Sequence, residues 1–220
     1  MYDVSVLICT YNREDMLVNT IKDVLAQSYE SFEVIVVDQT VQHLPETQSY
    51  IDSISNVVKF VKQSPSLTKA RNRALKEARG KILIFIDDDV RLNKDFIQEH
   101  VNAHRAGFSV VQGRIVEAKD SNKKASPTPQ NMDWKIKIRG RNDCLHMGGT
   151  NTLTGCNFSI ERDVVERVGL FDEFFQNLAI REDADYGIRC HRAGEKMIFW
   201  PKAELEHLRS NVGGVDTGIS

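Results

Sequence analysis

The chain has 220 residues, of which 41% are hydrophobic, and this length and composition suit one ordinary core with a smaller appended lobe. Its 29 Lys and Arg residues against 31 Asp and Glu residues give a net charge of −2, which argues against a nucleic-acid partner. The cysteines have no paired spacing, nothing at the start resembles a signal peptide, and no apolar run approaches the ~18 residues of a membrane span. We therefore expect a single domain (1–220) in the cytoplasm, without a transmembrane segment.

The first half of the chain alternates between β-rich runs and helical patterns. The β-rich runs are VSVLICT (4–10), FEVIVVD (32–38), VVKFVK (57–62), KILIFID (81–87) and SVVQGRIVEA (109–118). The predicted helices between them are 12–27 with Asn12 as N-cap, 46–53, 67–80 closed by Gly80, and 95–107 closed by Gly107. Strands that are apolar on both faces and alternate with helices are typical of a parallel sheet between helix layers. We therefore predict an α/β fold.

The second half of the chain is less regular. Residues 119–149 are polar, contain proline and have no clear period, which indicates a functional loop or a mobile flap. Order is predicted to resume at TGCNFSI (154–160), followed by helices over 162–168 and 181–194 and a last strand over 196–201. The tail 211–220 is small and polar, and we expect it to be flexible.

Three adjacent aspartates follow the fourth predicted strand, in the stretch FIDDDVR (85–91). Ligands of open α/β sheets bind beyond the carboxyl ends of the strands, and Asp38 ends the second strand at the same edge. Like charges in a row need a positive partner, and Mg²⁺ or Mn²⁺ suits a carboxylate cluster. The competing interpretation is a solvated acidic surface, and the buried character of the preceding strand argues against it. The pattern therefore predicts a metal site.

A metal ion bound by few carboxylates keeps positions for water and phosphate. The chain has neither a Walker lysine motif nor a glycine-rich dinucleotide fingerprint. We therefore expect a nucleotide diphosphate whose phosphates are bound by the metal and by a cation such as Lys69, Arg71 or Arg73.

These residues together resemble family 2 glycosyltransferases of the GT-A fold, which move a sugar from a nucleotide diphosphate. The resemblance extends from Val4 to Arg209, and it is closest to bacterial members that build surface polysaccharides, some of them rhamnosyltransferases. The matching stretches are VSVLICTYNR, FEVIVVD, the ARN of TKARNRAL, the DDD, TGCNFSI, VGLFDEFF, REDADYGIRCHRAG and EHLR. The resemblance implies a Rossmann-like, mostly parallel central sheet flanked by helices, with a smaller β element on the acceptor side.

On the donor side, the resemblance implies a role for each matching position, within a nucleotide-binding half that spans 1–118. The positions that match the nucleoside-binding residues are Thr10, Tyr11, Arg13, Asp38 and Arg71. Asp87 and Asp88 match residues near the ribose and the base, and Asp89 matches the last acid of the D-x-D motif, which binds the metal. Gln39 and Thr40 depart from the family, which usually has a second acid and a glycine there. This departure leaves the base open between a UDP- and a dTDP-linked donor.

Two residues near the end complete the donor side. His207 matches a late histidine that completes the metal coordination in some relatives, and Arg209 is placed to touch the diphosphate.

In the other half, 119–220, the resemblance implies the catalytic base and the acceptor side. Asp183 matches the carboxylate that takes the proton of the acceptor hydroxyl in inverting members. The residues expected on the acceptor side are Gly155, Asn157, Glu182 and Trp134. Transfer of a hexose or deoxyhexose to a saccharide or lipid-linked saccharide would fit, with the protein in the cytoplasm or peripherally at the inner membrane face.

Several motifs have plainer interpretations. Asp185 and Arg189, four residues apart, are expected to pair and brace their helix. His100 and His104 are expected to lie on a helix face, since no H-E-x-x-H pattern is present. His43 carries no signal, and Cys156 is expected to pack rather than react.

Three other functions compete with this interpretation. A nucleotidyltransferase would need a glycine-rich phosphate loop after the first strand, and CTYNRE is not one. A non-catalytic nucleotide-sugar or carbohydrate-binding module would not need both Asp89 and Asp183. A polyprenyl-phosphate sugar synthase would be favoured by a basic amphipathic or membrane segment, which the sequence does not show.

Overall fold

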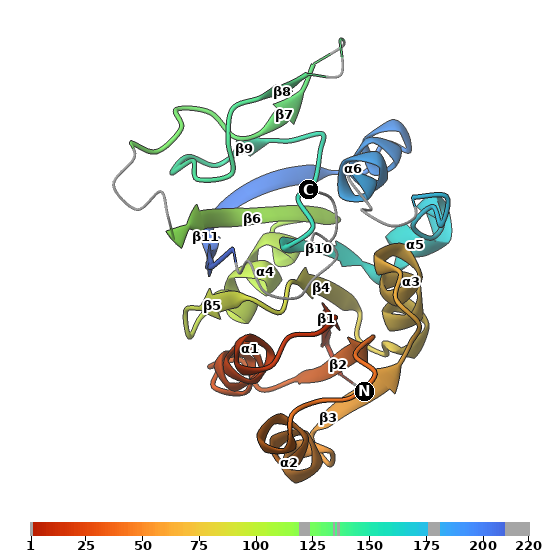
Figure 1. The fold of residues 1–220 in the computed structure, drawn as a ribbon. Helices are drawn as coiled ribbons and strands as arrows, with labels where there is room; N and C mark the ends of the chain where they lie inside the picture. The colour runs from red at the N-terminus through yellow and green to blue at the C-terminus, as the bar shows by residue number, and fades with distance from the viewer. Residues whose placement is uncertain (1, 119–123, 134, 136, 176–180, 210–220) are drawn as a thin grey trace, which may run out of the picture.

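A computed structural model of the chain describes residues 2–118, 124–133, 135, 137–175 and 181–209. Its main feature is a nine-stranded sheet flanked by helices (Figure 1). The strands are β1 (Val4–Thr10), β2 (Phe32–Asp38), β3 (Val58–Lys62), β4 (Ile82–Ile86), β5 (Val90–Leu92), β6 (Val110–Glu117), β7 (Asn131–Met132), β8 (Ile138–Arg139), β9 (Gly148–Gly149), β10 (Asn157–Glu161) and β11 (Met197–His207). The helices are α1 (Asp15–Leu25), α2 (Pro45–Ile54), α3 (Leu67–Glu77), α4 (Phe96–Arg105), α5 (Arg162–Val168) and α6 (Glu182–Arg192).

The sheet is mostly parallel, and the predicted fold class is confirmed. Its strand order is β3-β2-β1-β4-β10-β6-β11-β5, with β9 beside β11. Strands β1 to β4 pair in parallel, as do β6 and β11, whereas β10 is antiparallel to both β4 and β6. Because β10 lies between β4 and β6, strands from both halves of the sequence share one sheet.

Each face of the sheet is covered by its own set of helices, α1 and α4 on one side and α3, α5 and α6 on the other (Figure 1). Leu17 of α1 and Ile97 of α4 are fully buried against the alternate side chains of β1 that include Val6. Ala74 of α3 and Tyr186 of α6 are equally buried on the opposite face. Because helices cover both faces of the sheet, the side chains on both faces of its strands are buried. This explains why the strands have continuous apolar sequences.

Two predicted helix ends are wrong. Asn12 is not an N-cap: it has a φ of 51°, and α1 begins at Asp15 after Glu14. Helix α3 ends at Glu77, so Gly80 does not close it. Gly80 instead lies against the backbone of Ser5, where any side chain would clash, and this close approach explains the glycine.

The last strand is longer than predicted. The expectation of a strand over 196–201 is wrong at its far end, because β11 continues to His207. The register against β6 shifts between Trp200 and Glu204, an irregularity that interrupts the apolar pattern of the strand. The short strand β5, which follows the aspartates and pairs with the end of β11, was not predicted either.

The irregular region contains short strands. Strands β7 and β8 pair with each other as a separate two-stranded sheet, which corresponds to the predicted smaller β element. The predictions for Trp134 and for the tail 211–220 lie outside the described residues. No helix in the described parts of the chain is long and apolar enough to cross a membrane.

Candidate functional site

The backbone after β4 is fixed by contacts from three other parts of the chain. Thr20 of α1 donates its hydroxyl to the carbonyl of Asp88 (2.9 Å), and the N–H of Leu208 donates to the carbonyl of Asp89 (2.9 Å). Thr10, at the end of β1, donates its hydroxyl to Asp88 Oδ2 (2.6 Å). The predicted convergence of strand ends is therefore present. Asp88 and Asp89 do not lie on a solvated surface, since they are 5% and 3% exposed, whereas the side chain of Asp87 is 38% exposed.

Two cationic side chains face the buried aspartates. Arg13 Nη1 lies 2.8 Å from Asp89 Oδ2 and 3.7 Å from Asp88 Oδ1. His207 Nε2 lies 3.2 Å from Asp89 Oδ1. Burial raises the pKa of Asp88 to about 7, although Arg13 opposes the rise. Burial alone would lower the pKa of His207, but the neighbouring carboxylates of Asp89, Glu117 and Asp87 raise it to about 10.

The side chains around the aspartates include possible ligands for a metal ion. The donor set combines carboxylate oxygens of Asp87 and Asp89 with the imidazole of His207, and such ligands suit Mn²⁺ or Mg²⁺. Arg13 Nε is buried and has no hydrogen-bond partner among the described residues. A buried donor without a partner is costly, and a phosphate oxygen would satisfy it.

Arg209 lies at the same end of β11. Its guanidinium donates to both carboxylate oxygens of Glu117 (2.6 and 2.8 Å), and Glu117 is also 3.5 Å from His207 Nδ1. The side chain of Arg209 remains 61% exposed, which leaves it accessible to a ligand.

Asp38 has more partners than the sequence suggested. Its Oδ2 accepts from Lys62 Nζ (2.6 Å) and faces His43 Nε2 (3.0 Å), while its Oδ1 accepts from the N–H of Thr40 (2.9 Å). These hydrogen bonds outweigh burial and lower the pKa of Asp38. The prediction overlooked His43 and Lys62, although Lys62 could have been found: it ends β3 directly opposite Asp38. Tyr11 lies in the turn after β1 and is half-buried.

Gln39 and Thr40, the two departures from the family pattern, form hydrogen bonds that connect the segments following β1 and β2. Gln39 donates to the carbonyl of Thr10 (3.2 Å) and accepts from the N–H of Ser66 (2.6 Å). Thr40 accepts from the N–H of Asn12 (2.9 Å). These residues therefore shape the loops around Asp38.

Arg71 and Glu182 form a buried ion pair between α3 and α6, through Arg71 Nη1 and Glu182 Oε1. Each side chain is 5% exposed, so Glu182, which was expected on the acceptor side, is buried against Arg71. The guanidinium of Arg71 also packs on Gly155, where any added Cβ would clash with it. The glycine is therefore required by the close approach of this arginine.

Asp183, the predicted base, is held by two backbone donors. The N–H of Gly155 donates to its Oδ2 and the N–H of Ala184 to its Oδ1, both at 2.6 Å. The carboxylate also lies at the N-terminus of α6, where the helix dipole favours a negative charge. Asp183 is half-buried, which leaves it accessible to a substrate. Its neighbour Asp185 pairs with Arg189 (2.9 Å), as predicted.

Asn157 was expected on the acceptor side, but its side chain lies inside the protein. Its amide donates to the carbonyls of Arg114 (2.8 Å) and Ala203 (3.0 Å), and its oxygen is 3.0 Å from His100 Nε2. Burial lowers the pKa of His100 to about 3 and that of His104 to about 4, so both are neutral core residues. Asn157 therefore joins β10 to β6, β11 and α4.

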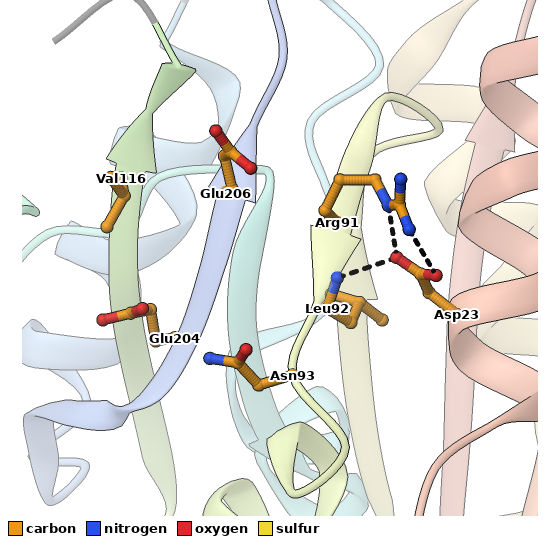
Figure 2. Close-up of a pocket in the computed structure, with 7 residues that line it drawn as sticks. All are labelled: Asp23, Arg91, Leu92, Asn93, Val116, Glu204 and Glu206. Carbon is orange, nitrogen blue, oxygen red and sulfur yellow. Dashed lines mark hydrogen bonds and ion pairs between the residues drawn. The ribbon is translucent and has the colours of Figure 1, made fainter. Parts of the chain in front are cut away.

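A cavity of about 310 Å³ lies elsewhere, beside the edge strand β5 (Figure 2). Its lining residues are Asp23, Arg91, Leu92, Asn93, Val116, Glu204 and Glu206. Arg91 there is already paired with Asp23 (2.6 Å), as the dashed lines in Figure 2 show. None of the predicted site residues lines this cavity.

The sequence matches the family described as Glycosyl transferase family 2 over residues 5–169. Glucosyl-dolichyl phosphate glucuronosyltransferase of Haloferax volcanii is 27% identical, over 93% of this chain and 68% of its own length. The uncharacterized glycosyltransferase YfnE of Bacillus subtilis is 35% identical, over 86% of this chain and 60% of its own length. The chain therefore spans about two thirds of these relatives.

Two solved structures share the fold at low identity. GalNAc-T7 with UDP, GalNAc and Mn²⁺ superposes with a TM-score of 0.79 at 16% identity, covering 94% of this chain and 44% of that one. The mannosyltransferase PcManGT of Pyrobaculum calidifontis, in complex with GDP-Man and Mn²⁺, has a TM-score of 0.66 at 18% identity and covers 95% and 57%. These likenesses confirm the GT-A fold.

Proposed function

Because this chain belongs to glycosyl transferase family 2, we propose that it transfers a sugar from a nucleotide-diphosphate donor to a hydroxyl of a saccharide or lipid-linked saccharide. The observation that carries the proposal is that Arg13 and His207 face the buried Asp89, while the half-buried carboxylate of Asp183 lies close enough to Asp87 to raise its pKa. In this proposal the half 1–118 binds the nucleotide, and the half 119–220 supplies the base and the acceptor side.

On the donor side, Asp89 and His207 would hold Mn²⁺ or Mg²⁺, with Asp87 beside them. The ion, when bound, stabilises the negative charge that grows on the departing diphosphate. His207 must release its proton to act as a ligand, because only the neutral imidazole coordinates a metal. Arg13, with its unsatisfied Nε, donates to a phosphate oxygen, and Arg209 approaches the diphosphate from the end of β11.

The nucleoside side of the proposal rests on Asp38 and its neighbours. A carboxylate accepts the N–H of a uracil or thymine ring, and Lys62 Nζ, 2.6 Å from Asp38, can donate to an adjacent ring carbonyl. This pairing favours a UDP- or dTDP-linked donor. Thr10, Tyr11, Asp87 and Asp88 surround the ribose in this proposal, and the charge of Arg71, which is paired with Glu182, acts on Asp87. The sugar itself is a hexose or deoxyhexose in this proposal.

Asp183 takes the proton of the acceptor hydroxyl while the oxygen of that hydroxyl attacks the anomeric carbon of the donor sugar. A single displacement, from the face opposite the leaving diphosphate, inverts the configuration at that carbon. Gly155 and Ala184 hold the carboxylate in place through their N–H groups. A fixed carboxylate positions the attacking oxygen and lowers the cost of reaching the transition state.

The metal assignment predicts a specific loss in Asp89→Asn. Wild-type protein should show an upward shift in melting temperature of about 5–10 °C with Mn²⁺ and one nucleotide sugar at about 100 times Kd. Asp89→Asn should lose that shift, because the ion that joins donor to protein has lost a ligand. A thermal-shift panel of nucleotide sugars with and without Mn²⁺ measures both. Asp163→Asn, an exposed acid on α5, is the control. An unchanged metal-dependent shift in Asp89→Asn contradicts the assignment.

The acceptor of this enzyme is proposed to be lipid-linked, with peripheral contact at the inner membrane face. The name of the Haloferax volcanii relative includes a dolichyl phosphate, and the 124–149 region of this chain exposes Ile138, Leu145 and Met147. Residues 124–149 also contain five Lys or Arg against two Asp, although the whole chain is acidic. Apolar and basic residues together favour an anionic lipid surface.

Sedimentation with vesicles tests this contact. The protein should sediment with vesicles rich in anionic lipid and not with neutral ones, and the Leu145→Asp/Met147→Asp double variant should remain in the supernatant. Val57→Asp, at an equally exposed site beside β3, should behave as wild type. Wild-type protein that stays in the supernatant with both vesicles contradicts the proposal.

A further inference from the structure

A thiol lies where the carboxylate and the imidazole of the site meet. Strand β10 pairs with β4 so that Asn157 is opposite Ile86, and the next residues along, Cys156 and Asp87, are therefore neighbours. His207 reaches the same point from the end of β11. Among the residues that the structure describes, these three side chains form the one group whose metal-ligand atoms all lie within 4.8 Å of one another.

The arrangement is close to the one that Zn²⁺ requires. Zinc binds sulfur at about 2.3 Å and nitrogen or oxygen at about 2.0–2.2 Å in a tetrahedron, which places its ligand atoms about 3.5 Å apart. His207 Nε2 and Asp87 Oδ2 are already 3.8 Å apart. Small side-chain movements would therefore close the three atoms around one ion.

The sulfur atom changes which metal the group prefers. Mg²⁺ and Mn²⁺ favour oxygen ligands, whereas a thiolate favours zinc, and for mixed ligands zinc binds more tightly than manganese. Burial and the carboxylates of Asp87 and Glu117 raise the pKa of the Cys156 thiol, so without a metal it is protonated. Coordination replaces protons by the ion: the thiol and the imidazolium of His207 each release one proton to solvent.

We propose that Asp87, Cys156 and His207 form a Zn²⁺ site with one oxygen, one sulfur and one nitrogen ligand and a fourth position open to water or phosphate. Zinc and the proposed Mn²⁺ or Mg²⁺ would share His207, so the two ions exclude each other. Only this exclusion rests on the proposed function, since Zn²⁺ binding itself needs no sugar donor.

Spectroscopy of the wild-type protein with Co²⁺, a probe that takes the place of zinc, tests the sulfur ligand directly. One equivalent of Co²⁺ should give a sulfur-to-cobalt charge-transfer band in the near ultraviolet, and Zn²⁺ should abolish it. A cobalt spectrum without this band overturns the proposal, whether or not any variant folds.

Titration of Zn²⁺ against a chromophoric chelator tests the same site with variants. Cys156→Ser should bind Zn²⁺ at least about tenfold more weakly than wild type and should lose the cobalt band. Cys190→Ser, which alters a similarly buried cysteine outside this group of three residues, should bind Zn²⁺ as wild type does. Equal affinity in Cys156→Ser and wild type overturns the proposal. Normal zinc binding without sugar transfer under any condition would instead contradict the proposed function alone.

Discussion

Replacing Asp183 by Asn is expected to lower the rate of sugar transfer by a factor of about 10² to 10⁴, the usual contribution of a general base. The amide cannot take a proton from the acceptor, whereas the donor contacts proposed for Asp38 and Asp89 are unchanged. The expected result is therefore a fall in kcat with an unchanged metal-dependent affinity for the donor. Initial-rate kinetics and a thermal-shift titration on the same preparation separate the two quantities.

The substitution also perturbs the local hydrogen bonds, and a control is needed. Asp183 accepts from two backbone N–H groups, of which an Asn side chain can satisfy only one with its oxygen. Asp185→Asn alters an acid on the same turn of α6 that is paired with Arg189, and the kcat of this variant should stay close to that of wild type. Turnover of Asp183→Asn within a factor of ten of wild type would remove the base assignment.

Glu182→Gln is expected to lower the free energy of unfolding by about 3–5 kcal/mol, because it leaves the buried guanidinium of Arg71 without its counter-charge. The side chain keeps its shape, so the loss comes from charge rather than from packing. Equilibrium unfolding in urea measures the change, provided that the slope with denaturant stays the same in both proteins.

The control variant for Glu182→Gln is Asp185→Asn, which is also on α6. Asp185→Asn breaks the more exposed Asp185–Arg189 pair, which should contribute about 0.3–0.5 kcal/mol. Adding Arg71→Met to Glu182→Gln should recover part of the lost stability, since the unpaired charge is then gone. Strictly additive losses in that double variant would show that the two side chains do not act as a pair.

The predicted elements that the structure confirms are those with a strong local pattern. The apolar runs that became β1, β2 and β4 are buried on both faces, so nearly every side chain in them is apolar. Helix ends were predicted less well because the partner that fixes an end lies far away in the sequence. Gly80 appears to be a helix terminator until Ser5, 75 residues earlier, is placed against it.

The candidate site also contains some residues that the sequence could predict and others that it could not. Thr10, Asp38 and the aspartates after β4 could be predicted, because residues at the ends of parallel strands share one edge of the sheet. His43 and Lys62 were overlooked as partners of Asp38, and Asn157, which was expected on the acceptor side, has its side chain inside the protein. Nothing in the sequence around His43 or Asn157 shows which way these two side chains point.

The sequence by itself determined the layered α/β architecture and the edge at which acidic residues collect, because both follow from short-range patterns of apolar and polar residues. Only the tertiary structure decided which cations face the aspartates and that Glu182 forms an ion pair with Arg71. It also decided that Cys156 lies beside Asp87 and His207. Those contacts join strands and helices that are distant along the chain, and their geometry depends on strand order and register, for which a single sequence carries no local signal.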